Sequence, residues 1–130
     1  MKFVQTEKAP SAIGPYSQAT VFNGIVYTSG QIALTPEGSD ELLRESVGVQ
    51  AVRVLENLKA VLEEAGSSMD SVIKTTIFLA DMDSFATVNE VYEKAFGEHK
   101  PARSTVAVKT LPKNALVEID AVAVVNDYSF

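Results

Sequence analysis

Two charged side chains stand inside apolar, strand-like segments in the last third of the chain. Arg103 precedes the run 104–108, and Glu118 lies within the run 116–125. Ionised groups are costly in apolar surroundings unless they are paired or used. The guanidinium of an arginine presents a planar fork of donors that fits a carboxylate, and a glutamate nearby can order or deprotonate a water. The pair therefore indicates a small carboxylate ligand with chemistry next to it.

Alternation along the two strands groups the polar side chains by face. Arg103 and Thr105 fall on one face of their strand, and Glu118 and Asp120 share a face of the last strand. A buried salt bridge between Arg103 and Glu118 explains these residues as well as a catalytic site does. The two strands alone leave both interpretations open.

Other polar residues occupy positions that generic secondary structure does not require. Asn89 lies on the apolar stripe of an expected helix, where its amide either bonds to nearby backbone or supports a site. Turn chemistry explains the glycine and proline before Tyr16, but it does not explain Tyr16 or Gln18. After Ser29, Gly30 would let a ligand approach the backbone, although a bulge accounts for it equally well.

The composition restricts the classes of protein that the chain can belong to. Its 130 residues fit one domain, residues 1–130, and 46% hydrophobic residues are too many for a disordered chain. With no cysteine and a single histidine, disulfides, thiol nucleophiles and cysteine-ligated zinc are excluded, and a Ser-His-Asp triad is disfavoured. A formal net charge of −6 disfavours a nucleic-acid partner.

The N-terminal third contains neither a signal-peptide pattern nor a membrane-spanning pattern. Residues 1–8 lack the apolar core of a signal peptide. The uncharged stretch 9–36 is interrupted by prolines and glycines, so it does not read as a membrane span. We therefore expect a soluble, cytoplasmic protein without a membrane partner.

Hydrophobic periodicity predicts an α/β chain in the order β-β-β-α-β-α-β-β. The first helix is expected from Asp40 or Glu41 to Ala65, with Ser39 or Asp40 as its N-cap and Gly66 ending it. The second helix is expected from about residue 84 to 96, after a cap at Asp81 or Asp83 and before Gly97. The expected strands are 2–6, 19–22, 25–31, 72–79, 103–109 and 116–125, with an Asn23-Gly24 hairpin turn.

The last strand indicates an oligomer. After Asp120 it is apolar on both faces, with Val122 and Val124 on one face and three small or branched apolar residues on the other. Two helices cover only one face of such a sheet, and the chain offers no third helix. The second apolar face therefore predicts a homo-oligomer whose sheets face inward.

Taken together, these segments resemble the RidA family, also called YjgF or reactive intermediate deaminases. The resemblance spans nearly the whole chain, and each motif is weak alone. The segments that carry it are 14–19 (GPYSQA), 29–32 (SGQI), 57–58 with 65–66, 72–76 (VIKTT), 85–92 (FATVNEVY), 101–104 (PARS) and 117–119 (VEI).

The resemblance implies a fold, an assembly and a reaction. The fold is a chorismate-mutase-like mixed sheet with two helices on one face, in a homotrimer with three clefts between subunits. The reaction is the hydrolysis of reactive imines or enamines, chiefly 2-iminopropanoate and 2-iminobutanoate, to 2-oxo acids and ammonia. Neither a cofactor nor a metal is implied.

The resemblance also implies roles for individual residues. Arg103 matches the arginine that grips the substrate carboxylate, and Glu118 matches the carboxylate that positions the attacking water. Tyr16, Ser29 and Asn89 match positions that line the cleft, with backbone contact from Gly30.

One position departs from the family pattern. The family often has cysteine two residues after the arginine, where this chain has Thr105. The backbone carbonyl at that position is the group thought to hold the water, and threonine keeps it. Deaminase activity therefore remains an expectation, whereas thiol-based reactivity is absent. Thr105 also bears on cleft size and substrate preference.

Three alternative functions remain open. A non-catalytic binder of 2-oxo acids would need the arginine but not the glutamate. An endoribonuclease or translation inhibitor is disfavoured by the acidic charge and by the lack of an interleaved basic and aromatic patch. A chaperone-like or protein-binding role through exposed apolar surface is the third alternative.

Overall fold

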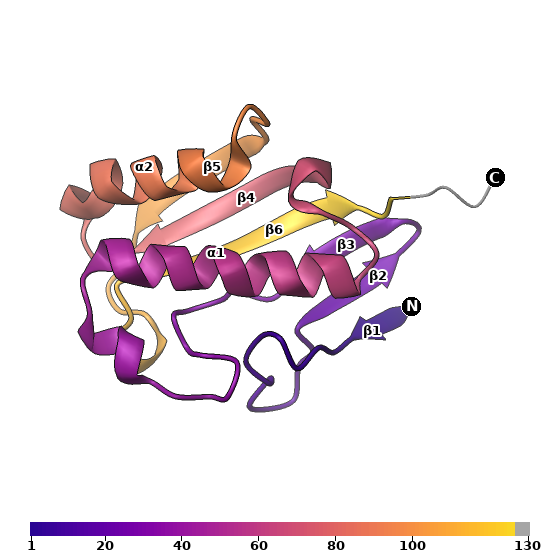
Figure 1. Ribbon diagram of the computed structural model, residues 1–130, viewed down its shortest axis with the longest axis horizontal. Helices are drawn as coiled ribbons and strands as arrows, with labels where there is room; N and C mark the ends of the chain where they lie inside the picture. Colours follow the sequence, from indigo (N-terminus) through magenta and orange to yellow (C-terminus); the bar gives the residue numbers. More distant parts are fainter. Residues whose placement is uncertain (127–130) are drawn as a thin grey trace.

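A mixed six-stranded sheet with both helices on one face organises the chain (Figure 1). The computed structural model describes residues 1–126. The strand order is β1-β2-β3-β6-β4-β5, and every neighbouring pair is antiparallel except β4 and β5, which run parallel. The elements are β1 (Lys2–Val4), β2 (Ala19–Phe22), β3 (Ile25–Thr28), α1 (Val47–Glu64), β4 (Val72–Leu79), α2 (Phe85–Phe96), β5 (Ala102–Ala107) and β6 (Val117–Val124). The predicted mixed α/β fold is therefore confirmed.

The predicted hairpin joins β2 to β3. Asn23 and Gly24 have φ values of 52° and 78°, the left-handed pair that a tight hairpin turn requires. The pairing of Phe22 with Ile25 closes the turn. The Asn23-Gly24 turn thus fixes the register of β2 against β3, and the predicted hairpin is confirmed.

The predicted start of the first helix is wrong by about six residues. Residues Glu41–Arg44 form a separate 3-10 turn, η1, and α1 begins only after Ser46. The Ser46 side chain accepts a hydrogen bond from the Val49 backbone N–H at 3.4 Å, so Ser46 is the N-cap in place of Ser39 or Asp40. At the other end, Gly66 follows the helix with a φ of 83°, as predicted.

The core lies between the helices and one face of the sheet. Along β6, Val117, Ile119, Ala121 and Ala123 alternate into this core, and each is at most 2% exposed. From α1, Val54, Leu58 and Val61 pack against the same layer. Burying these side chains supplies most of the driving force for folding.

Within residues 1–126, no helix lies over the opposite face of the sheet, here called the open face. Glu118, Asp120, Val122 and Val124 of β6 point to this face and are only partly buried or exposed. Tyr27 and Val106, on β3 and β5, are exposed apolar side chains. The sheet therefore carries apolar side chains on both faces, as the sequence of the last strand after Asp120 predicted.

Within residues 1–126, neither α1 nor any other helix combines the length and the apolar character needed to cross a membrane.

Candidate active site

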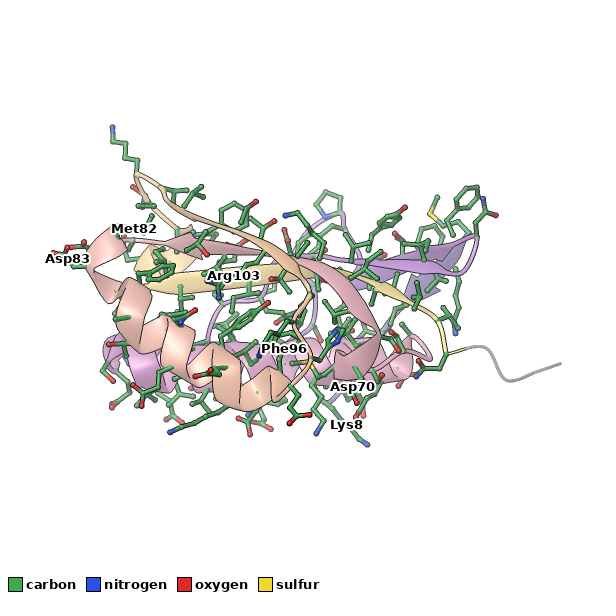
Figure 2. All side chains as sticks on the ribbon, turned by 90° about the horizontal axis from the view of Figure 1, so that it is seen from above. Lys8, Asp70, Met82, Asp83, Phe96 and Arg103 are labelled. Atoms are coloured by element: carbon green, nitrogen blue, oxygen red, sulfur yellow. The ribbon has the colours of Figure 1, made fainter. Side chains whose placement is uncertain are left out.

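Arg103 lies on β5, on the face of the sheet that α2 covers. Its parallel partner on β4 is Thr75, which is fully buried beneath the helices. The guanidinium Nη1 donates a hydrogen bond of 2.7 Å to Oδ1 of Asn89 on α2. In Figure 2, Arg103 lies between the sheet and α2. The Asn89 amide thus supports Arg103, one of the two roles considered for it.

Aromatic rings on α2 complete the cradle of Arg103. Its guanidinium carbon lies 4.9 Å from the ring centroid of Tyr92 and 5.5 Å from that of Phe85. The Tyr92 hydroxyl shares a 2.7 Å hydrogen bond with Thr75. Burial raises the pKa of Tyr92, although its bond to Thr75 and the charge of Arg103 oppose that rise. Asn89 engages one side of the guanidinium, and the planar group retains further donors for a ligand.

Thr105 packs beside Asn89 and Arg103 around a gap that is too small to hold a water molecule in the single chain. Within residues 1–126, its hydroxyl Oγ1 is the buried side-chain polar atom that has no hydrogen-bond partner. We call Arg103, Asn89, Phe85, Tyr92 and Thr105 the arginine half-site. Burial of an unpartnered hydroxyl lowers the stability of the folded protein. In the described chain, the Thr105 side chain therefore affects this half-site through its size and not through a hydrogen bond.

Glu118 lies on the open face, in a second pocket of about 480 Å³. Tyr16, Ser29 and Gly30 line this pocket with Glu118. Ser29 donates from its hydroxyl to the Ser17 carbonyl at 2.6 Å, which fixes the loop against the end of β3. We call Glu118, Tyr16, Ser29 and Gly30 the glutamate half-site.

The environment of Glu118 favours its protonated form. Burial raises the pKa of the carboxyl, and the negative charge of Asp120 on the same face raises it further. Burial also raises the pKa of Asp120, against the opposing effects of Lys74 and of the Thr76 backbone. A carboxyl with a raised pKa in a pocket suits proton transfer.

Gln18 holds the loop that carries Tyr16. The side chain is 1% exposed. Its Oε1 accepts from the Thr6 N–H at 2.7 Å, and its Nε2 donates to the carbonyls of Thr6 and Pro10 at 3.0 and 2.8 Å. This is the reason for a glutamine in the Tyr16 segment, which turn chemistry left unexplained.

Gly30 is required by the position of Glu118. A Cβ at residue 30 would lie 2.0 Å from Oε2 and 2.7 Å from Cδ of Glu118. We expect Gly30→Ala to force the Glu118 side chain out of place and to lower at least tenfold any activity that depends on this carboxyl, with the fold retained because the carboxylate lies at the end of a side chain. Kinetics with circular dichroism would check this. A Gly30→Ala protein with wild-type kinetics would contradict the close approach as a functional constraint.

The two half-sites lie on opposite faces of the sheet. Arg103 pairs with Thr75 and Glu118 pairs with Phe78, and these β4 residues are three apart, so their side chains point in opposite directions. The alternative of a buried Arg103–Glu118 salt bridge is therefore wrong within one chain. The structure brings together Arg103, Asn89 and Thr105, and separately Glu118, Tyr16, Ser29 and Gly30.

Sequence reasoning missed some residues of both half-sites. Phe85 and Tyr92 were assigned only to the apolar stripe of α2, although an aromatic residue three or four positions from Asn89 on one face is a detectable signal. Lys113, in a turn after β5, also lines the glutamate half-site pocket. No local sequence signal placed Lys113 there.

Comparison with known proteins adds independent findings. The family model Endoribonuclease L-PSP matches residues 6–125. A Salmonella typhimurium protein named 2-iminobutanoate/2-iminopropanoate deaminase is 47% identical over 126 residues, which cover 95% of this chain and 97% of that protein.

Solved structures agree with these matches. A Thermotoga maritima crystal structure has a TM-score of 0.92 and 51% identity, covering 98% of this chain and 99% of that one. Escherichia coli TdcF, solved with bound serine, has a TM-score of 0.89 and 44% identity, covering 95% and 98% of the two chains. By sequence and fold, the chain belongs to the Endoribonuclease L-PSP family, which includes the proteins named RidA and YjgF.

Proposed function

We propose that the protein hydrolyses 2-imino acids such as 2-iminobutanoate and 2-iminopropanoate to 2-oxo acids and ammonia. The observation that carries this proposal is the composition of the two half-sites. One offers a pre-organised guanidinium, and the other offers a carboxyl with a raised pKa beside an exposed glycine backbone. The name of the Salmonella typhimurium relative supports the same reaction class.

Arg103 binds the substrate carboxylate in this proposal. Asn89 and the rings of Phe85 and Tyr92 hold the guanidinium in place before the ligand arrives. Pre-organisation lowers the entropic cost of binding and fixes the distance from the carboxylate to the reacting carbon. Arg103 thereby selects 2-imino acids over imines that lack a carboxylate.

Glu118 positions the attacking water and transfers its protons in this proposal. A protonated imine is electrophilic, so a strong nucleophile is not needed. The water oxygen bonds to C2 as the C=N π pair moves to nitrogen, and the Glu118 carboxylate accepts a water proton. Glu118 then passes this proton to the amino group. As the C–N bond breaks, Glu118 accepts the hydroxyl proton, the C=O bond forms, and that proton leaves with the ammonia as ammonium. The Thr105 carbonyl is proposed to help hold the water, while Tyr16, Ser29, Gly30 and Asn89 line the cleft.

A complete site requires two copies of the chain. Because Arg103 and Glu118 lie on opposite faces of one sheet, the arginine half-site of one copy must meet the glutamate half-site of another. We propose that this occurs in a homotrimer, whose assembly also covers the apolar open face. Each of its three clefts would take one half-site from each of two neighbours.

Mixed assemblies test the sharing of sites. Arg103→Ala and Glu118→Gln chains are each expected to be inactive alone. When they are unfolded and refolded together in equal amounts, a cleft is intact if its arginine comes from the Glu118→Gln chain and its glutamate from the Arg103→Ala chain. Random assembly makes roughly a quarter of clefts intact. Recovery of about that share of wild-type turnover is expected, and none would be recovered if each site belonged to one chain.

The reaction itself is tested by imine lifetime. A threonine dehydratase generates 2-iminobutanoate while semicarbazide traps it, with and without this protein. We expect the protein to shorten the lifetime of the trappable imine and to hasten ammonia release. No acceleration by folded, assembled protein that still binds a 2-oxo acid would replace this proposal with the non-catalytic binder. RNA cleavage without imine hydrolysis would replace it with the endoribonuclease.

A further inference from the structure

The turn η4 (Pro112–Asn114) between β5 and β6 contains an unusual backbone conformation. Lys113 has φ 54° and ψ 26°, and Asn114 has φ 57°. Asparagine enters the left-handed region comparatively readily, whereas a lysine there is uncommon and strained. Strain of this kind persists where the surrounding structure enforces it, often next to a functional site.

The flanks of the turn hold Lys113 in this conformation. Leu111 and Ala115 are 7% and 1% exposed. The Asn114 N–H donates to the Leu111 carbonyl and the Ala115 N–H donates to the Pro112 carbonyl, both at 3.0 Å. Just beyond, buried Gln50 accepts from the Leu116 N–H at 3.0 Å. The turn is thus anchored on both sides, and Lys113 projects from a fixed backbone.

Lys113 lines the pocket of the glutamate half-site. Among the residues that line this pocket, Lys113 is the ammonium and Glu118 the carboxyl. Ile13, Ile32 and Leu34 supply apolar wall. In the single chain this pocket measures about 480 Å³, and in the proposed assembly a neighbouring copy covers its open side. Lys113 gives the pocket a positive charge that the substrates considered above do not use.

We infer that Lys113 is a specificity-determining residue that binds a second anionic group on the substrate side chain. This inference rests on the proposed function, in which Arg103 of another copy takes the carboxylate next to the imine. Lys113 is then free for a distal carboxylate, and the apolar wall accommodates the carbons between. The substrate class this adds is the 2-imino dicarboxylates, hydrolysed by the same exchange of water for ammonia.

The test compares two substrates in wild type and Lys113→Gln. An amino-acid oxidase generates the imino dicarboxylate from aspartate or glutamate, and a dehydratase generates 2-iminobutanoate, each trapped with semicarbazide. We expect Lys113→Gln to lower the ratio of kcat/KM for the dicarboxylate to that for 2-iminobutanoate about tenfold at low salt. Added salt should lower the wild-type ratio as well, because the ammonium is exposed.

Two further variants make the result specific. Lys109→Gln removes the same charge from an exposed lysine in the same connection and should leave the ratio unchanged. Lys113→Gly removes the charge and relieves the backbone strain, so it should lower the ratio while raising the melting temperature. A ratio in Lys113→Gln equal to that of wild type, with 2-iminobutanoate still hydrolysed, would overturn the role of Lys113. Failure of wild type on both substrates would instead overturn the proposed function.

Discussion

Arg103→Ala is expected to abolish imine hydrolysis while the protein remains folded and assembled. In the proposed site, the guanidinium is the group that neutralises the substrate carboxylate inside the cleft. Removing one partner of such a desolvated pair costs about 3–5 kcal/mol, which corresponds to a loss of roughly 10²- to 10⁴-fold in rate. The imine-lifetime assay measures this loss, and size-exclusion chromatography with light scattering measures the assembly.

Controls separate this effect from general damage. Arg44→Ala removes an exposed arginine of η1, whose contact with Asp40 is 3.7 Å, and should leave hydrolysis unchanged. Arg103→Lys keeps the charge but loses the fork held by Asn89 and the rings, so it should recover only part of the activity. An assembled Arg103→Ala protein with full turnover would rule out the carboxylate-binding role.

Glu118→Gln is expected to lower turnover about 10²- to 10⁴-fold, the range typical of a lost general acid–base group. Glutamine preserves the shape of the side chain but accepts no proton. Binding of a 2-oxo acid product should change little, because Arg103 supplies the main attraction. The measurement is kcat from imine lifetime set against Kd for the 2-oxo acid from calorimetry. An affinity that falls as far as the rate would identify Glu118 as purely structural.

The raised pKa of Glu118 fixes the direction of the pH dependence. Water activation needs the carboxylate, so turnover should rise with pH through a value above that of an ordinary glutamate. In the pH range between the pKa of the unfolded chain and the raised pKa of the folded one, the folded state binds more protons and its stability falls as pH rises. Glu118→Gln should remove both the rising limb and this loss of stability.

Asp120→Asn provides the matched control for Glu118. Asp120 lies two residues away on the same face, and its charge raises the pKa of Glu118. The variant should retain turnover, with the rising limb of the pH profile displaced to lower pH. A limb that stays in place would show that another group controls the profile.

Much of the fold followed from local patterns in the sequence. The β4 bounds, the Asn23-Gly24 turn and the span of α2 agree with prediction within a residue. The start of α1 did not, because Glu41–Arg44 has helical composition yet forms only a short 3-10 turn before Ser46 caps the helix. Choosing among several serine and aspartate caps needs tertiary contacts that a sequence pattern does not contain.

The candidate site was predictable as a set of residues but not as an arrangement. Alternation correctly grouped Arg103 with Thr105, and Glu118 with Asp120. Alternation within a strand does not predict which residues of β5 and β6 point to the same face of the sheet. That depends on how each strand pairs with β4. For the same reason, the sequence alone did not exclude a salt bridge between Arg103 and Glu118. The strand pairing excludes it within one chain, because it places the two side chains on opposite faces of the sheet. The conformation of Lys113 depends on the buried flanks of its turn, which lie outside any local motif.

In the proposed shared cleft, the separation of the two half-sites on opposite faces of one sheet would make catalytic activity depend on protein concentration. If a lone chain carries both half-sites facing apart, it has no complete cleft at any substrate level. On dilution below the assembly's dissociation constant, activity per milligram should fall as the protomers separate. A newly synthesised chain would then be inactive after folding. It would become active only when it assembles with other copies.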